Sequence, residues 1–280
     1  MHAAEASASA QTTVVEAGRR PFLTLALEFW AYRELLYFLV WRDAKVRYKQ
    51  TVLGAAWAVL QPFMTMVVFT IVFGRLAGVP SDGQPYALFS FAALVPWTYF
   101  AQGLGNAAAS LVGNRMITRV YFPRLLVPAA SILTPLIDLA IALGMMFAIQ
   151  LGWYRSLPPV TVVLLPAFIV LAAVTAFAAG LWFAALNVKF RDVRYVLPFV
   201  LQFWMFATPI AYPASLVPER WRPLYGLNPM VTVVEGFRWC LLGTPAPALM
   251  AWVSCASLAA ALWLGLVYFR RVEGTFADVL

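Results

Sequence analysis

The sequence predicts an all-α membrane protein with six transmembrane helices. Of its 280 residues, 63% are hydrophobic and only 11% are charged, whereas a soluble domain is about half apolar and about a quarter charged. The apolar residues lie in continuous runs and not in the alternating pattern of β-barrel strands. Because lipid offers no hydrogen-bond partner to backbone groups, each span must be a helix.

The chain divides into a tail, an interface helix, a membrane domain and a second tail. We expect a partly disordered N-terminal tail at 1–27, an amphipathic interface helix at 28–53, a six-span domain at 54–270 and a cytoplasmic C-terminal tail at 271–280. A span needs about 20 apolar residues. The predicted spans are 54–77, 86–111, 125–151, 160–187, 195–212 and 248–269.

Lysine and arginine are distributed unevenly between the loops. Fifteen of the 20 lie in the N-terminal region, in 112–124, in 188–194 or in 270–280, and the other five lie on the opposite side. Cytoplasmic loops carry such an excess, so both termini are predicted to be cytoplasmic. Topology and anionic headgroups explain the net charge of +8, which does not indicate nucleic-acid binding.

The segment before the first span is basic and amphipathic. On a helix, one apolar face carries Tyr37, Trp41, Ala44, Tyr48 and Val52. The cations Arg42, Lys45 and Lys49 lie away from it. Asp43 and Arg47 have the spacing of an i, i+4 ion pair. The helix is predicted to lie in the cytoplasmic interface, either as a simple anchor or as a lever beside a cytoplasmic motor. Its interface residues are Trp41, Arg42, Lys45, Arg47, Tyr48 and Lys49.

The segment 213–247 is apolar enough to cross, but a crossing would move the C-terminal arginines outside. Asn228 suits a helix N-cap and Pro229 the first helical position. A helix from there places Glu235 and Arg238 three residues apart on one face. We predict two short re-entrant or interfacial helices on the external side. Their ion pair either holds the segment together or belongs to an external gate.

Asp138 stands in the third predicted span, where a carboxyl group is costly and faces protein or water. No His or Lys lies at similar depth in the first five spans. The sequence therefore favours a hydrogen bond to a Ser, Thr or Asn on a neighbouring helix over a proton relay. His2 is the only histidine, so a His-based metal site or a Ser-His-Asp triad lacks its residues, and no metal site is predicted.

Five blocks of the sequence resemble one family, the ABC-2 type permeases that export polysaccharides. The similarity covers roughly 28–270, and the O-antigen and teichoic-acid exporters are the most similar group. The blocks are RDAKVRYKQTVLGAAWAVLQP (42–62), PYALFSFAALVPWTYF (85–100), NRMITRVYFPRLLVP (114–128), NVKFRDVRYVLPFVLQFWMFATPIAYP (187–213) and LNPMVTVVEGFR (227–238).

The resemblance implies partners, cargo and cofactors. Two copies of this chain would form a pore in the cytoplasmic (inner) membrane, and two copies of a separate ATP-binding cassette subunit would drive it. The cargo would be a glycan, typically linked to a polyprenyl diphosphate lipid. The sequence contains no Walker A motif. We therefore expect no cofactor on this chain, with ATP and Mg²⁺ bound by the partner subunit.

The cytoplasmic connections are candidates for contact with that subunit. A loop that only sets topology needs no apolar cluster, yet apolar residues alternate with arginines in 113–124. With the resemblance, this segment is interpreted as a coupling helix. Arg191 and Asp192 form a second candidate contact, unless they cap helix ends locally. The coupling residues are Arg115, Met116, Ile117, Arg119, Tyr121, Arg191 and Asp192.

Aromatic residues are candidates for a channel lining. Those of the fifth span recur at i, i+4, i+8 and i+11 and so share one helix face. Sugar C–H faces stack on aromatic rings, and two aromatics of the second span would join across a dimer interface. Lipid contact, interface belts or helix packing explain most membrane aromatics equally well. The candidates are Tyr195, Phe199, Phe203, Phe206, Trp97 and Tyr99.

Other functions stay open beside glycan export. The same family includes permeases for a drug or a small lipid. A lipid-linked glycosyltransferase would need acidic or metal-binding clusters, which the loops lack. A proton-coupled transporter normally shows more buried acidic residues than the single Asp138.

Overall fold

A computed structural model describes residues 29–49, 56–112 and 122–274 of the chain. Within these ranges every regular element is helical, as predicted. The longer helices are α2 (Arg33–Lys49), α3 (Ala56–Phe69), α4 (Tyr86–Ala109), α6 (Leu126–Leu133), α7 (Leu136–Gly152), α8 (Leu165–Lys189), α9 (Val193–Phe206), α11 (Pro229–Leu242) and α12 (Ala248–Glu273). The short ones are η1 (Thr70–Leu76), η2 (Val160–Leu164), η3 (Ala214–Leu216), η4 (Glu219–Trp221) and α10 (Arg222–Tyr225).

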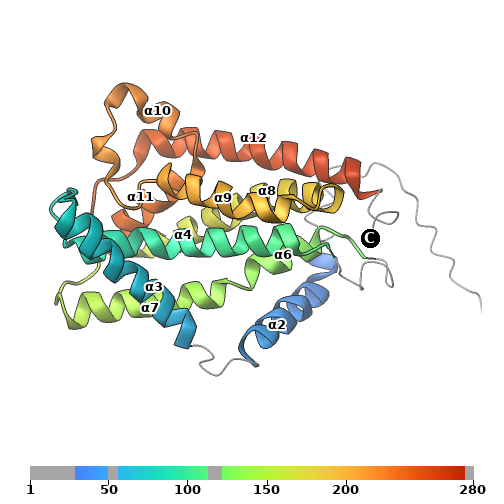
Figure 1. Cartoon of the computed structure of the whole chain (residues 1–280), viewed down its shortest axis with the longest axis horizontal. Coiled ribbons are helices and arrows are strands. Elements are labelled where there is room, and N and C mark those ends of the chain that lie inside the picture. Colours follow the sequence, from blue (N-terminus) through green and yellow to red (C-terminus); the bar gives the residue numbers. More distant parts are fainter. Residues whose placement is uncertain (1–28, 50–55, 113–121, 275–280) are drawn as a thin grey trace, which may run out of the picture.

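The central helix of the bundle is α4. It packs against α3, α7, α8 and α11, while α8 also packs against α12, and the long helices run alongside one another (Figure 1). Small residues allow this approach, as in membrane helix pairs generally. A Cβ atom added at Gly180 of α8 would lie 2.9 Å from the Cβ atom of Ala107 on α4. The two backbones are therefore closer than a larger side chain at this position permits.

Five helical segments are long and apolar enough to cross a membrane: 59–76, 86–109, 126–152, 160–189 and 250–273. They match five of the six predicted spans. The remaining one, predicted at 195–212, is the 14-residue helix α9. At 1.5 Å per residue it is about 21 Å long, shorter than the bilayer core of about 30 Å. The helix ends just before Thr208-Pro209, a dipeptide that disfavours helical backbone. A count of six spans therefore stays a prediction.

The last turns of α8 and α12 lie at the same end of the bundle, and they carry Lys189, Arg270 and Arg271. We call this the basic end. Helix α2 starts here: Leu35 and Leu36 pack on an apolar cluster formed by the adjoining ends of α6, α8 and α12. From this end α2 runs obliquely to the bundle axis, so its C-terminal turn lies beside the middle of the bundle (Figure 1).

The segment 213–247 lies at the opposite end and contains α11, which starts at Pro229 as predicted. Asn228 is its N-cap, because its side chain accepts a hydrogen bond from the backbone N–H of Met230 at 3.1 Å. The helix packs against α4, α8 and α12 and is buried along most of its length. Before α11 the segment contains the short helices η3, η4 and α10, and the predicted pair of helices is not confirmed. Whether α11 is re-entrant stays a prediction.

The contact between α4 and α8 predicts a specific sensitivity at Gly180. Gly180→Ala is expected to force the two helices apart and to lower the midpoint of thermal unfolding by several degrees. Gly144→Ala is the matched control, because no atom lies within 4 Å of the added Cβ there and alanine favours a helix more than glycine does. Equal unfolding temperatures for the two purified variants would contradict close packing at Gly180.

Candidate functional site

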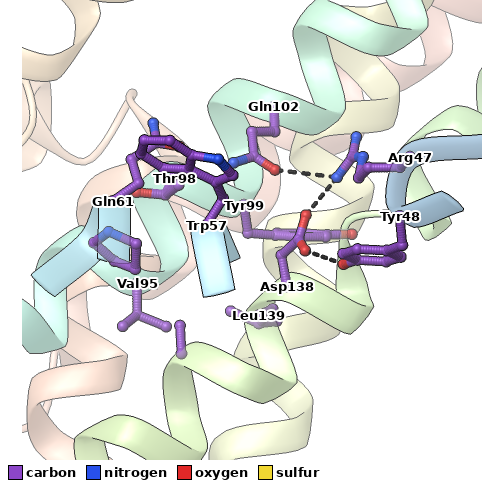
Figure 2. A pocket seen from close by; sticks show the side chains of 12 residues that line it. Arg47, Tyr48, Trp57, Gln61, Val95, Thr98, Tyr99, Gln102, Asp138 and Leu139 are labelled. Atoms are coloured by element: carbon purple, nitrogen blue, oxygen red, sulfur yellow. Dashed lines mark hydrogen bonds and ion pairs between the residues drawn. The ribbon is translucent and has the colours of Figure 1, made fainter. Parts of the chain in front are cut away.

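A cluster of polar side chains joins α2 to the bundle. Arg47 of α2 forms an ion pair with Asp138 of α7, and the hydroxyl group of Tyr48 donates a hydrogen bond to the same carboxylate (Figure 2). Arg47 Nη1 also lies 3.4 Å from the side-chain oxygen of Gln102 on α4. Asp138 is thus the shared acceptor of two α2 side chains, and α2 is tied to both α7 and α4.

This cluster corrects the prediction for Asp138. Its partners are a basic side chain and a tyrosine hydroxyl, and not the Ser, Thr or Asn that was expected. The basic partner was overlooked because α2 was assigned to the membrane surface. The C-terminal turn of α2 instead lies against the start of α7, where Arg47 pairs with Asp138 (Figure 2).

The predicted ion pair within α2 is also corrected. Asp43 pairs with its neighbour Arg42 at 2.8 Å and not with Arg47. Of the predicted apolar stripe, Tyr37 and Trp41 are exposed and Ala44 is buried. Leu39, which is not part of that stripe, is also buried. Leu39 and Ala44 therefore lie on the face of α2 that packs on the bundle, and the Tyr37 and Trp41 rings lie on its exposed face. Lys45 lies over the exposed Trp41 ring, with its Nζ atom 4.5 Å from the ring centre.

The Tyr48 hydroxyl group is held in its protonated form. Burial and the hydrogen bond to Asp138 raise the pKa of Tyr48 to about 12. The phenol is thus a hydrogen-bond donor at every physiological pH, and the carboxylate that it contacts has a permanent neutral partner beside the charged one.

A pocket of about 240 Å³ adjoins this cluster. It is lined by side chains from α2, α3, α4 and α7, among them Trp57, Gln61, Tyr99 and Gln102 (Figure 2). Gln61 and Gln102 were not among the predicted site residues. The available signal was a glutamine inside a predicted span, because polar side chains at such positions usually face protein or a cavity.

The candidate coupling residues are placed only in part. Arg115, Met116, Ile117, Arg119 and Tyr121 lie outside the described residues. Arg191 and Asp192 are exposed in the turn between α8 and α9, at the basic end. Asp192 holds the N-cap position of α9, yet its side chain makes no capping hydrogen bond. Local capping therefore does not explain Asp192, and its surface is available to a partner.

The candidate channel residues fall into two groups. Tyr195, Phe199, Phe203 and Phe206 form a stripe on α9 in which each side chain is between 53% and 77% exposed. We call these four residues the α9 stripe.

The second-span candidates lie elsewhere. Trp97 and Tyr99 are only 6% and 2% exposed, and the Trp97 ring packs against Phe100 with ring centres 5.4 Å apart. The structure thus does not place Trp97 and Tyr99 on the exposed surface that carries the α9 stripe. Tyr99 lines the pocket instead.

The candidate gate residues are held in a buried polar network. Arg238 Nη1 lies 2.8 Å from the Glu235 carboxylate, and the Arg238 side chain is fully buried. Arg238 also donates to the backbone oxygens of Phe89 (3.3 Å) and Ile210 (2.9 Å). The predicted i, i+3 pair is therefore present, and in this conformation the arginine joins α11 to α4 and to the segment after α9.

Asn228 extends this network to α9. Besides capping α11, its side-chain oxygen accepts a hydrogen bond of 2.9 Å from the Trp204 indole N–H. Its amide nitrogen donates to the Thr208 hydroxyl group at 3.0 Å. These two hydrogen bonds join the start of α11 to the C-terminal end of α9 and the residues after it.

The family model described as "ABC-2 type transporter" matches residues 34–242. The chain belongs to the ABC-2 type transporter family. It is 30% identical over 260 residues to the O-antigen export system permease protein RfbA of Myxococcus xanthus, covering 91% of this chain and 99% of the relative. It is 24% identical over 258 residues to RfbA of Klebsiella pneumoniae, covering 88% and 95%. To the polysialic acid transport protein KpsM of Escherichia coli it is 22% identical over 197 residues, covering 69% and 76%.

Membership in the ABC-2 family gives the helices a role. Chains of this family are the membrane subunits of transporters and work with an ATP-binding cassette subunit. This chain is accordingly a multi-pass membrane protein. The matched region runs from α2 through α11 and so contains the Asp138 cluster, the α9 stripe and the Arg238 network. The family favours transport over the alternative of a membrane-bound glycosyltransferase.

The ion pair of Arg47 and Asp138 can be tested in the ABC-2 permease itself. Asp138→Asn is expected to lower the free energy of unfolding by about 1–3 kcal/mol, because it leaves a guanidinium group without its counter-ion. The loss is smaller than for a fully enclosed pair, since the Arg47 side chain is 30% exposed. Arg47→Gln should cost a similar amount, and the double variant less than the sum.

The matched control is Asp43→Asn, which breaks a more exposed pair of the same helix and should change stability by less than about 1 kcal/mol. Thermal unfolding of the purified chain in nanodiscs gives the comparison. Additive losses from the two cluster variants would contradict a direct pair.

Proposed function

We propose that this chain is the permease subunit of an ATP-driven exporter that moves a lipid-linked polysaccharide, such as an O-antigen or a teichoic acid, across the cytoplasmic membrane. The observation that carries the proposal is the nearly end-to-end match to a relative named as an O-antigen export permease. A second relative is named for transport of polysialic acid, another glycan. The chemical class that these names share is a long polysaccharide.

The functional unit would contain two copies of this chain and two ATP-binding cassette subunits. The subunits would bind ATP and Mg²⁺, since the sequence itself lacks a Walker A motif. The basic end would face the cytoplasm, which the positive-inside rule supports, and both chain termini would lie there. Arg191 and Asp192, exposed at that end, would meet the cassette subunit together with the 113–121 segment.

The α9 stripe would form the wall of the pore between two copies of the chain. An exposed aromatic surface on one helix needs a covering, which lipid, a second copy or a cargo can supply. A polysaccharide presents C–H faces that stack weakly on aromatic rings, and this contact needs no charged side chain. A wall of this kind lets successive sugar units pass, because each contact is easily broken.

The helix α11 would close the external end of the pore. The ion pair and the hydrogen bonds of Arg238 support this role, because they would keep α11 in one position while the pore is closed. The link from Asn228 to Trp204 supports joint movement of α11 and α9. Opening would then widen the pore and move the gate in one step.

The export function predicts a specific cellular phenotype. Deleting the gene for this chain should remove a surface polysaccharide and cause its lipid-linked precursor to accumulate on the inside, because synthesis continues without transport. The measurement pairs surface glycan labelling with extraction of the precursor. Complementation by the Gly144→Ala variant should restore both to wild-type levels. A normal surface glycan in the deletion strain would refute this function.

The α9 stripe predicts a more local defect. Phe199→Ala and Phe203→Ala should each lower surface glycan severalfold, because the pore wall loses stacking surface, while membrane insertion and dimer assembly stay intact. Trp252→Ala is the control, since Trp252 of α12 is 79% exposed but lies on another helix. If all three variants assemble and export equally, the stripe contacts lipid and the pore lies elsewhere.

A further inference from the structure

One side of α2 carries cations and apolar side chains together. Its positions recur at i, i+3, i+4, i+7, i+8 and i+11, a spacing that places them on a single face of a helix. A shallow, open groove runs between their side chains. We call this surface the α2 outer face, and its residues are Phe38, Trp41, Arg42, Lys45, Val46 and Lys49.

The contact of α2 with the bundle fixes the direction of this face. Each residue of an α-helix turns by about 100°, so residues two positions apart point in nearly opposite directions. Arg47 points toward Asp138 of α7, with which it forms an ion pair (Figure 2). Lys45 and Lys49 each lie two positions from Arg47. They therefore point away from the bundle, and both are exposed.

The two lysines have no counter-ion in the described part of the chain. Neither Lys45 nor Lys49 forms an ion pair there. Asp43, the nearest acidic residue of α2, is paired with Arg42 at 2.8 Å. The i, i+4 spacing brings the two ammonium groups close together, and like charges at this spacing destabilise a helix. An anion bound between them would offset this repulsion and accept charge-assisted hydrogen bonds from both.

The apolar part of the α2 outer face indicates that this anion belongs to a lipid. Phe38 is 52% exposed, Trp41 51% and Val46 66%. A dissolved anion gains nothing from these side chains. The boundary between lipid headgroups and acyl chains instead accommodates aromatic rings, and helices that lie in it carry lysine or arginine beside tryptophan, phenylalanine or leucine.

The position of α2 along the chain also favours a lipid over a soluble protein as the partner. Helix α2 ends at Lys49, and α3 begins at Ala56 and leads into the apolar segment 59–76, which is long enough to cross a membrane. A connection of this length reaches at most about 25 Å when fully extended. The C-terminal turn of α2, which carries Lys49, is therefore kept near the membrane.

We propose that the α2 outer face binds the headgroup of an acidic phospholipid, phosphatidylglycerol, in the leaflet on the side of the basic end. Its phosphate group meets the ammonium groups of Lys45 and Lys49, and the Trp41 ring packs beside the glycerol part of the headgroup. Phosphatidylethanolamine is a poorer ligand, because its own ammonium group cancels the phosphate charge. The inference concerns the membrane around the chain and not the cargo, so its test is independent of the export function.

The test measures which lipids the purified full chain retains in native mass spectrometry. The chain is first equilibrated with equal amounts of phosphatidylglycerol and phosphatidylethanolamine that have identical acyl chains. The wild type should retain phosphatidylglycerol in preference. Lys45→Gln and Lys49→Gln should each lower this preference about fivefold, the effect of one lysine near an acidic membrane surface. The double variant Lys45→Arg/Lys49→Arg keeps both charges and should keep the preference.

The matched control is the double variant Arg155→Gln/Arg220→Gln. It also removes two exposed cations, but from the connections after α7 and after α9. Arg220 resembles Lys45 in lying over an exposed tryptophan ring, that of Trp221. The control should retain phosphatidylglycerol as the wild type does. An equal loss in the control and in Lys45→Gln/Lys49→Gln would overturn the proposal, because net charge alone would then explain the preference.

Thermal unfolding in nanodiscs gives a second measurement. The wild type should unfold at a higher temperature in phosphatidylglycerol than in phosphatidylethanolamine, because a ligand of the folded state stabilises it. This difference should shrink in Lys45→Gln/Lys49→Gln. An unchanged lipid preference in that variant would overturn the proposal. So would displacement of phosphatidylglycerol by inorganic phosphate, or a variant that keeps phosphatidylglycerol but loses the cassette subunit or a polyprenyl diphosphate lipid.

Discussion

A carboxylate inside an apolar bundle must find positive charge or hydrogen-bond donors, and in this protein Asp138 decides where α2 lies. The ion pair with Arg47 and the bond from Tyr48 fix the C-terminal turn of α2 against α7. Its N-terminal half packs on the apolar cluster at the basic end. With both halves attached, α2 runs obliquely to the bundle axis (Figure 1), and its C-terminal turn lines one side of the pocket.

A buried charge also holds α11 at the opposite end of the bundle, but this charge is more deeply buried than Arg47. Arg238 is fully buried and satisfied by Glu235 and by two backbone oxygens, and its guanidinium carbon lies 3.5 Å from the centre of the Phe89 ring. Breaking such a network is costly because a charge is left without water or partner. Arg47 keeps partial contact with its surroundings. The attachment of α2 is therefore the easier of the two to release.

Local signals in the sequence predicted much of this structure. The five long spans follow from apolar run length, and the start of α11 follows from Asn228-Pro229, because capping depends on residues adjacent in sequence. The partner of Asp138 depends instead on the direction of a helix 90 residues away, which periodicity does not encode. Trp97 and Tyr99 were misplaced for a related reason. They belong to a helix that is apolar on all sides, and such a helix is buried, so its aromatics pack inside the bundle.

Aromatic residues serve two different purposes in this chain, and burial distinguishes them. The α9 stripe is exposed, and Gln202 is the one amide side chain among its close neighbours along the helix. Tyr195 is hydrogen-bonded by its neighbour Arg194, but the three phenylalanine rings carry no polar group and would hold a sugar only by weak contact. In the pocket, the rings of Tyr48 and Tyr99 stand beside glutamine side chains and an unpaired hydroxyl group. In the proposed exporter, the exposed α9 stripe can meet a passing chain, whereas the Tyr99 ring is packed inside the bundle.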